Sequence, residues 1–103
     1  MIKTIEIIIK NGIFEKIRCF IVWDKNICYF NEKKIMIEEE WKERLLRTIR
    51  LWKKEYGALN GIDQEEFKIT IISDVEETIH GKGVFPNNYQ EFMELLGELN
   101  DKK

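Results

Sequence analysis

His80 is the only histidine in the chain, and it follows the only serine, Ser73, and its neighbour Asp74. These residue types serve as base, nucleophile and orienting acid in serine hydrolases, which hold the serine on a sharp turn of the form G-x-S-x-G. That form is absent, and Ser73-Asp74 has the composition of an ordinary turn. We therefore expect His80 to be an exposed side chain near a turn, and the chain not to be an enzyme.

Cys19 and Cys28 lie within alternating stretches typical of strands, and neither stands at a helix start beside a base that could activate it. A pair of cysteines is too few for a disulfide framework, and the sequence has no C-x-x-C or Cys/His cluster of the kind that binds zinc. We predict that both cysteines are reduced and lie in the core or the sheet.

Four acidic residues crowd the first half of a helical stretch, where they suit the helix dipole. They are Glu38, Glu39, Glu40 and Glu43. Consecutive residues on a helix point in different directions, so these carboxylates need partners from elsewhere before they can surround a cation. We predict no metal and no cofactor.

Gly81-Lys82-Gly83 precedes a second helical stretch, and a glycine-rich turn before a helix can hold a phosphate. The P-loop pattern G-x-x-x-x-G-K-[ST] is absent. The glycines could equally meet a need for special backbone conformation. The sequence leaves anion binding at this turn open.

Basic residues on the polar side of the first helical stretch, with a lysine before the second, form a candidate nucleic-acid-binding ridge, because such a ridge can follow phosphates. They are Arg44, Arg47, Arg50, Lys54 and Lys82. The interspersed glutamates neutralise much of their charge. A nucleic-acid-binding accessory protein is therefore an alternative function.

Aromatic and aliphatic side chains supply the candidate site that we favour, on the face of the first strands that points away from the helices. The main residues are Phe14, Phe20, Val22 and Phe30, accompanied by Ile8 and Cys28. Soluble monomers seldom leave such a patch open, and aromatic anchors suit protein interfaces. We expect this face to bind another protein, to form a homodimer, or to be covered by a loop of the same chain.

The elements that position these side chains begin with a hairpin of two alternating stretches, residues 2–10 and 13–23. A two-residue Asn11-Gly12 turn would place isoleucines opposite cations, so we prefer a bulged loop that sets Ile7 against Ile17. The same register pairs Ile5 with Cys19 and Glu6 with Arg18.

A turn at residues 24–26 leads to a third predicted strand, residues 27–30, whose Ile27 and Tyr29 face the core. A polar loop over residues 31–34 follows.

The central element is a helix predicted from Ile37 to Tyr56, because apolar residues recur every three or four positions along it. The stripe consists of Ile37, Trp41, Leu45, Ile49, Trp52 and Tyr56. Truncating Trp41 or Trp52 to alanine should cost about 3 to 5 kcal/mol of stability.

After a turn over residues 58–65, Phe67 to Ile71 alternate as a fourth strand and residues 77–81 return as a short fifth. Asn88, with Glu91 after it, marks the start of a second helix. The order βββαββα predicts an α+β fold, in which two helices pack on one face of an antiparallel sheet of four to five strands.

At 103 residues the chain has the length of one two-layer domain, residues 1–103. Its 17 Lys+Arg and 19 Asp+Glu give a net charge of −2, so no overall field attracts nucleic acid or an anionic membrane. We expect a cytoplasmic protein without a membrane partner, because the opening residues lack a signal-peptide pattern and no apolar run has the length of a membrane span.

Short motifs spread over most of the chain carry a family resemblance. They are Asn11-Gly12-Ile13-Phe14 with Arg18, Trp52-x-x-x-Tyr56, residues 61–67, Gly81, and Phe85-Pro86-x-Asn88 with Phe92. Together they resemble a loose group of small uncharacterised proteins from AT-rich bacterial genomes and their mobile elements, with W-x-x-x-Y, a D-G turn, W-x-[LI]-x-[IL] and G-S-N-x-Y-P-x-N. Here Gly61 precedes Asp63, Phe67 replaces the tryptophan and Lys82-Gly83 replaces Ser-Asn. The resemblance implies a fold and not a reaction.

The first hairpin and the two-layer layout are also similar to those of emfourin-type metalloprotease inhibitors. Asn11-Gly12-Ile13-Phe14 stands where that family has a Gly-Gly-Phe turn. This likeness implies a second alternative, a protease inhibitor of the emfourin type.

These observations favour a non-catalytic protein-binding module whose partner is another protein or a second copy of the chain. A small acidic protein of this kind would suit an inhibitor carried by a phage or mobile element. One example is a counter-defence protein of the anti-CRISPR type.

Overall fold

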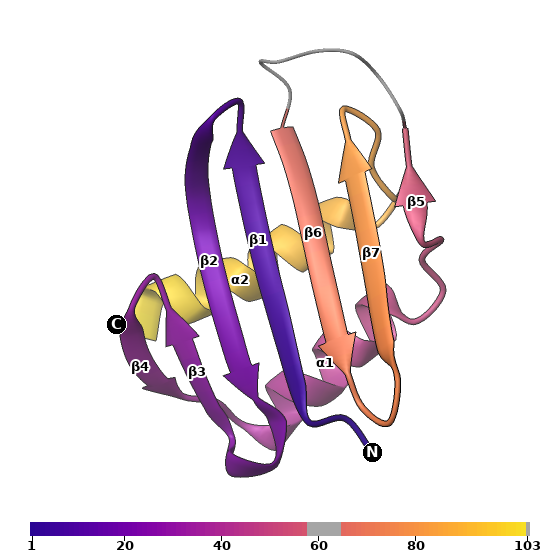
Figure 1. The fold of residues 1–103 in the computed structure, drawn as a ribbon. Coiled ribbons are helices and arrows are strands. Elements are labelled where there is room, and N and C mark those ends of the chain that lie inside the picture. The colour runs from indigo at the N-terminus through magenta and orange to yellow at the C-terminus, as the bar shows by residue number, and fades with distance from the viewer. Residues whose placement is uncertain (58–64, 103) are drawn as a thin grey trace.

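A computed structural model of the protein describes residues 1–57 and 65–102, which form a seven-stranded sheet with two helices on one of its faces (Figure 1). The strands are β1 (Thr4–Asn11), β2 (Phe14–Val22), β3 (Ile27–Phe30), β4 (Lys33–Met36), β5 (Glu55–Tyr56), β6 (Glu65–Ile72) and β7 (Glu76–Lys82). The helices are α1 (Glu39–Ile49) and α2 (Tyr89–Lys102), and a short 3₁₀ helix spans Trp23–Lys25. The predicted turn over residues 58–65 lies, except for Glu65, outside the described residues.

The strand order across the sheet is β4-β3-β2-β1-β6-β7-β5. All pairs are antiparallel except β5 and β7, which run parallel, so the sheet is mixed. The predicted α+β class is confirmed. The predicted strand number and the order βββαββα are wrong, because β4 and β5 were not foreseen.

β1 is the middle strand, and its Ile5, Ile7 and Ile9 are fully buried, as the alternation predicts. The predicted hairpin register is wrong: Ile7 pairs with Cys19, and a bulge lies between Ile9 and Lys10. Away from the turn this differs from the prediction by two positions. The buried faces are nevertheless those predicted, since only an odd shift moves side chains to the other face of a sheet.

In β3, unlike β1 and β2, the side chains predicted to face the core are on the wrong face of the sheet. Val22 pairs with Ile27, which turns Cys28 and Phe30 toward the helices and leaves Tyr29 on the outer face. The connecting loop contains the 3₁₀ helix and Asn26, whose φ is 54°. It is one residue longer than the predicted turn, and a one-residue shift reverses every side chain of the strand.

β4 replaces the predicted polar loop over residues 31–34. Asn31 and Glu32 have φ values of 46° and 73°, the conformation of a two-residue hairpin turn with both central residues at positive φ. The Asn31 side chain accepts a hydrogen bond from the Arg18 amide at 2.9 Å, and the Asn31 amide donates to the Arg18 carbonyl at 2.8 Å. These bonds fix the turn against β2.

α1 buries Trp41, Leu45 and Ile49, as the helical spacing predicts, but it ends at Ile49 and not at Tyr56. The chain then passes through a turn and joins the sheet edge as β5, where the His80 amide donates to the Lys54 carbonyl at 2.9 Å. Trp52 and Tyr56 pack on the same core as the helix, although both follow its last residue. Because both are apolar contacts of that core, the sequence keeps the helical spacing of apolar residues beyond Ile49.

The two helices meet through Trp41, whose Nε1 donates to the Leu95 carbonyl of α2 at 3.0 Å. Together they cover the inner face of the sheet, where Phe67 and Ile69 of β6 are fully buried. This confirms the predicted fourth and fifth strands and the placement of both helices on one face.

Candidate functional site

The outer face of the sheet, opposite the helices, has an apolar region on β2, β3 and β4. The register aligns Val22, Ile27 and Met36 in one row across these strands, and Phe20, Tyr29 and Lys34 in the next. Phe20, Tyr29 and Met36 are 37%, 41% and 62% exposed. We name Phe20, Val22, Ile27, Tyr29 and Met36 the outer-face patch.

The rest of the outer face is mostly polar. The row of Phe20 continues through Glu6 on β1 and Thr70 on β6 to Thr78 on β7. The next row runs from Arg18 through Ile8 and Lys68 to His80. The row of Val22 contains Ile72 of β6, which is 38% exposed. Most of the apolar residues of the outer face, but not Ile8 and Ile72, thus lie on β2, β3 and β4.

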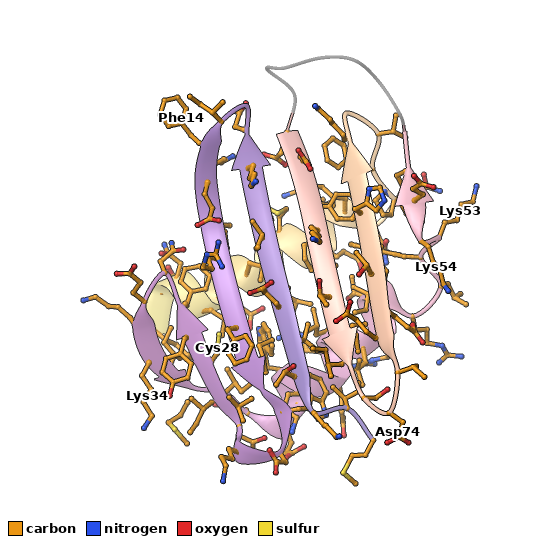
Figure 2. The ribbon with its side chains drawn as sticks, viewed as in Figure 1. Phe14, Cys28, Lys34, Lys53, Lys54 and Asp74 are labelled. Carbon is orange, nitrogen blue, oxygen red and sulfur yellow. The ribbon has the colours of Figure 1, made fainter. Side chains whose placement is uncertain are left out.

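The structure brings together only part of the predicted protein-binding set. Phe20 and Val22 belong to the patch. Phe14 is 73% exposed, but it lies at the tip of the β1–β2 hairpin (Figure 2), six residues or about 20 Å along β2 from Phe20. Phe30 is 2% exposed and belongs to the core, so its prediction as a surface residue is wrong for the reason given for β3.

Sequence reasoning missed Ile27, Tyr29 and Met36. The alternation of β3 was visible, but its direction depended on the length of the loop before it. Met36 follows Ile35 in a four-residue strand that begins with two lysines, so its alternation was too short to be distinguished from a loop.

The charge beside the patch is positive on β4. Lys34 (Figure 2) pairs with Tyr29 in the register and has no ion pair among the residues that the structure describes. Lys33 pairs with the buried Phe30 and therefore lies on the helix side of β4. Arg18, by contrast, donates to both carboxylate oxygens of Glu15 at 3.0 and 2.7 Å. Its guanidinium lowers the pKa of Glu15, and the same hydrogen bonds raise the pKa of Arg18.

Ser73, Asp74 and His80 do not converge. The Ser73 amide donates to the Val75 carbonyl at 2.9 Å within the β6–β7 turn, where Figure 2 shows Asp74. His80 lies farther along β7 beside Glu55, with Nε2 3.6 Å from a carboxylate oxygen, an ion pair only when the imidazole is protonated. The prediction that His80 is exposed is confirmed.

Cys19 and Cys28 lie side by side in the core on adjacent strands, with their Sγ atoms 2.9 Å apart. The predicted placement in the core or the sheet is confirmed, but the predicted outer-face position of Cys28 is wrong, because Cys28 is fully buried. The hydrogen bond to Cys28 and the burial raise the pKa of Cys19 well above its ordinary value. Cys19 is therefore a protonated thiol at neutral pH, which is a poor nucleophile.

At the acidic start of α1, the Glu39 carboxylate is already bonded to side chains of the protein. The Nζ atom of Lys42 is buried and donates to the Trp23 carbonyl and to Asn26, both at 2.7 Å, and to Glu39 at 3.4 Å. The hydrogen bond from Asn26, followed by that from Lys42, lowers the pKa of Glu39. Within residues 1–57 and 65–102 no group of three or more potential metal ligands is present.

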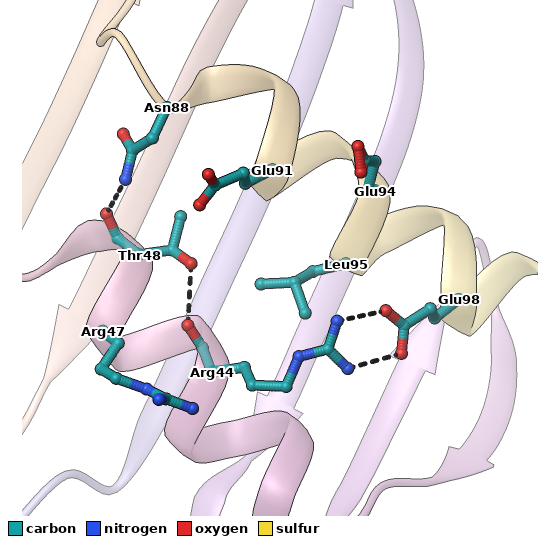
Figure 3. A pocket seen from close by; sticks show the side chains of 8 residues that line it. All are labelled: Arg44, Arg47, Thr48, Asn88, Glu91, Glu94, Leu95 and Glu98. Atoms are coloured by element: carbon teal, nitrogen blue, oxygen red, sulfur yellow. Dashed lines mark hydrogen bonds and ion pairs between the residues drawn. The ribbon is translucent and has the colours of Figure 1, made fainter.

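The basic residues predicted as one ridge have different surroundings, and Arg47 lines both the pocket beside Arg44 and the groove that Arg50 and Lys54 border. Arg44 makes a bidentate contact with Glu98 of α2 at 2.9 and 2.6 Å, beside a pocket of about 410 Å³ between the helices (Figure 3). Three α2 glutamates line that pocket, which makes it unsuitable for phosphate. Lys82 pairs with Glu66 in the β6–β7 register, whereas Arg50 and Lys54 border a different groove beside β7.

Most of the aromatic motif residues quoted for the resemblance meet in one cluster at the end of the core. Its rings are Trp52, Tyr56, Phe67, Phe85, Tyr89 and Phe92, with neighbouring centroids between 4.5 and 6.4 Å apart. Asn88 accepts from Trp52 Nε1 at 2.6 Å and donates to the Thr48 carbonyl at 2.8 Å. These motif residues therefore have a packing role.

The glycines of Gly81-Lys82-Gly83 also serve the fold. A Cβ atom at Gly81 would lie 2.5 Å from a ring carbon of Phe67. Gly83 has a φ of 72°, and its amide donates to the Glu65 carbonyl at 3.1 Å. Gly83 thus meets the predicted need for special backbone conformation, whereas Gly81 is needed for the space that Phe67 occupies. The Gly83 amide is already bonded within the protein.

Neither helix of the described chain is long and apolar enough to cross a membrane.

Comparisons with models of protein families, with curated proteins and with solved structures find no match.

Proposed function

We propose that this chain is a non-catalytic protein-binding module whose contact surface is the outer-face patch. The observation that carries the proposal is the exposure of Phe20, Tyr29 and Met36 on three neighbouring strands. None of the described elements packs over this face, since both helices lie on the other side. Exposed aromatic side chains held on a sheet are suitable anchors for a protein interface.

The partner suited to this surface has an apolar centre and an acidic group on the side that meets β4. The apolar centre would cover Phe20 and Tyr29, and the acidic group would face Lys34. Lys34 would mainly affect the association rate and its salt dependence, and the aromatic anchors would supply most of the affinity.

A finer form of the proposal is an inhibitor that blocks its target by contact, such as a counter-defence protein of the anti-CRISPR type. It is supported by the small size, the acidic balance and the resemblance to proteins of bacterial mobile elements. Expression of the chain in cells that clear a targeted plasmid by CRISPR would test it, with plasmid retention as the expected result. If the cells clear the plasmid as fast as without the protein, the chain does not inhibit that CRISPR system, and only the proposal of a protein-binding module stands.

The test of the surface compares Phe20→Asp and Tyr29→Asp with Thr78→Asp, a control on the polar side of the same face. A partner that co-elutes with the wild type should remain with Thr78→Asp and be lost from both patch variants. Circular dichroism should show all three variants folded. Retention of the partner by both patch variants would remove the outer-face patch from the proposal.

Light-scattering mass distinguishes a foreign partner from a second copy. A homodimer that Phe20→Asp converts to a monomer would assign the patch to self-association. Phe30→Asp is unsuitable for either measurement, because Phe30 lies in the core and a buried carboxylate there would unfold the protein.

A further inference from the structure

A groove of about 730 Å³ lies on the helix side of the sheet, between α1 and the β6–β7 pair. It lies on the opposite side of the sheet from the outer-face patch. Apolar side chains from the helix, the following turn and both strands line it: Leu46, Ile49, Trp52, Ile71 and Ile79. Leu46, Trp52 and Ile71 are only partly buried, so the groove presents apolar surface to solvent.

Three cations border this groove: Arg47, Arg50 and Lys54. In the part of the chain that the structure describes, none of them has a carboxylate within ion-pair distance. Arg44, one helical turn before Arg47, shows the contrast, because Glu98 binds its guanidinium from α2. The groove therefore has positive charge available for a ligand.

Two carboxylates, Glu43 and Glu77, also line the groove. Glu43 precedes Arg50 by two turns of α1, about 10 Å along the helix. Glu77 pairs with Ile71 near the beginning of β7, whereas Lys54 lies beside His80 farther along that strand. The groove is thus basic at the end formed by Arg50 and Lys54 and acidic at the other.

We propose that this groove binds an amphipathic anion, a medium-chain alkyl carboxylate. Its headgroup contacts Arg50 and Lys54, with Arg47 adding to the positive field, and its chain covers Leu46, Ile71 and Ile79. The volume lies within the range of about 300 to 1,000 Å³ typical of small-molecule sites. Glu43 and Glu77 disfavour a second anionic group at the far end, so the ligand carries one negative charge.

The first test is titration of the full chain with decanoate below its micellar concentration, followed by methyl NMR and calorimetry. The methyl resonances of Leu46, Ile71 and Ile79 should shift together. Decanedioate should bind more weakly than decanoate, because its second carboxylate meets the acidic end. Equal binding of decyltrimethylammonium and decanoate would show that the cations do not recognise the ligand and would overturn the proposal.

The second test uses the double variant Arg50→Gln/Lys54→Gln, with Lys53→Gln as the matched control. Lys53 and Lys54 lie side by side on the surface (Figure 2), but Lys53 does not line the groove. The double variant should bind decanoate roughly tenfold or more weakly, the loss of charge-assisted contacts, and Lys53→Gln should bind as the wild type does. Equal weakening by the double variant and Lys53→Gln, or no weakening by either, would overturn the proposal. Neither result bears on the outer-face patch, which shares no residue with the groove.

Discussion

At the scale of single residues, Gly81 shows how closely the aromatic cluster packs. A methyl group there would approach Phe67 to 2.5 Å and Tyr56 Cβ to 2.9 Å. Gly81→Ala should therefore lower the free energy of unfolding by about 1 to 3 kcal/mol, the usual effect of overpacking. Urea denaturation measures this change.

Gly97 supplies the control for this substitution, because nothing lies within 4 Å of a Cβ atom built there. It stands inside α2, where glycine is less favourable than alanine by about 0.5 to 1 kcal/mol, so Gly97→Ala should stabilise the protein. Equal effects of the two substitutions would contradict the packing of β7 against the ring of Phe67.

Cys19 and Cys28 give a second prediction at this scale. Both are fully buried, and the hydrogen bond between them raises the pKa of Cys19, so iodoacetamide should react very slowly with the folded protein. Mass spectrometry after denaturation should show both thiols alkylated. Rapid alkylation of the native protein would mean that β3 opens readily from β2.

At the scale of elements, the contact between Arg44 and Glu98 connects α1 to α2. The Arg44 hydrogen bonds lower the pKa of Glu98 in the folded state. This stabilisation is therefore fully present above the carboxyl's unfolded pKa and is lost as the pH falls through the lower folded value. Because both side chains are about 40% exposed, the effect should be small.

Glu98→Gln should accordingly lower the melting temperature near neutral pH and have less effect in acid, where the wild type has lost the same contact. Glu94→Gln is the control, since Glu94 lines the same pocket on α2 but makes no ion pair among the described residues. The prediction fails if the two variants differ from the wild type equally at every pH.

The elements also show what sequence patterns can and cannot determine. The isoleucines of β1 identify its buried face, because that face depends only on alternation within the strand. The facing of β3 depends on whether its loop begins at Trp23 or Asp24, a difference of one residue that composition does not determine. The end of α1 was hidden because Trp52 and Tyr56 continue the helical spacing while packing from a turn and a strand.

The residues of the candidate sites could likewise be predicted only where alternation within one strand determines their position. Phe20 and Val22 could be predicted from alternation in β2, whereas Tyr29 and Met36 required the correct facing of β3 and a strand at β4. The groove beside β7 could not be predicted, because it forms only where Ile71 and Ile79 of the sheet meet α1.

At the scale of the whole molecule, the cations of the predicted ridge have different surroundings. Arg44 is paired between the helices, Arg50 and Lys54 border the groove, and Lys82 lies in the strand register beside Glu66. With a net charge of −2, the protein should show no measurable affinity for a short DNA duplex or single strand even at low salt. Fluorescence anisotropy tests this, and salt-sensitive binding lost in Arg50→Gln/Lys54→Gln would support the nucleic-acid alternative.

The place of β1 in the middle of the sheet affects how the chain folds as it is made. β1 and β2 leave the ribosome before β6, so one edge of β1 stays unpaired until β6 has been made. The isoleucine face is fully covered only after α2 has followed. A nascent chain that stops before residue 65 would have an unpaired strand edge and exposed apolar side chains. Such intermediates are targets for chaperones and proteases, so the amount of protein in a cell should depend on how quickly the second half of the chain is translated.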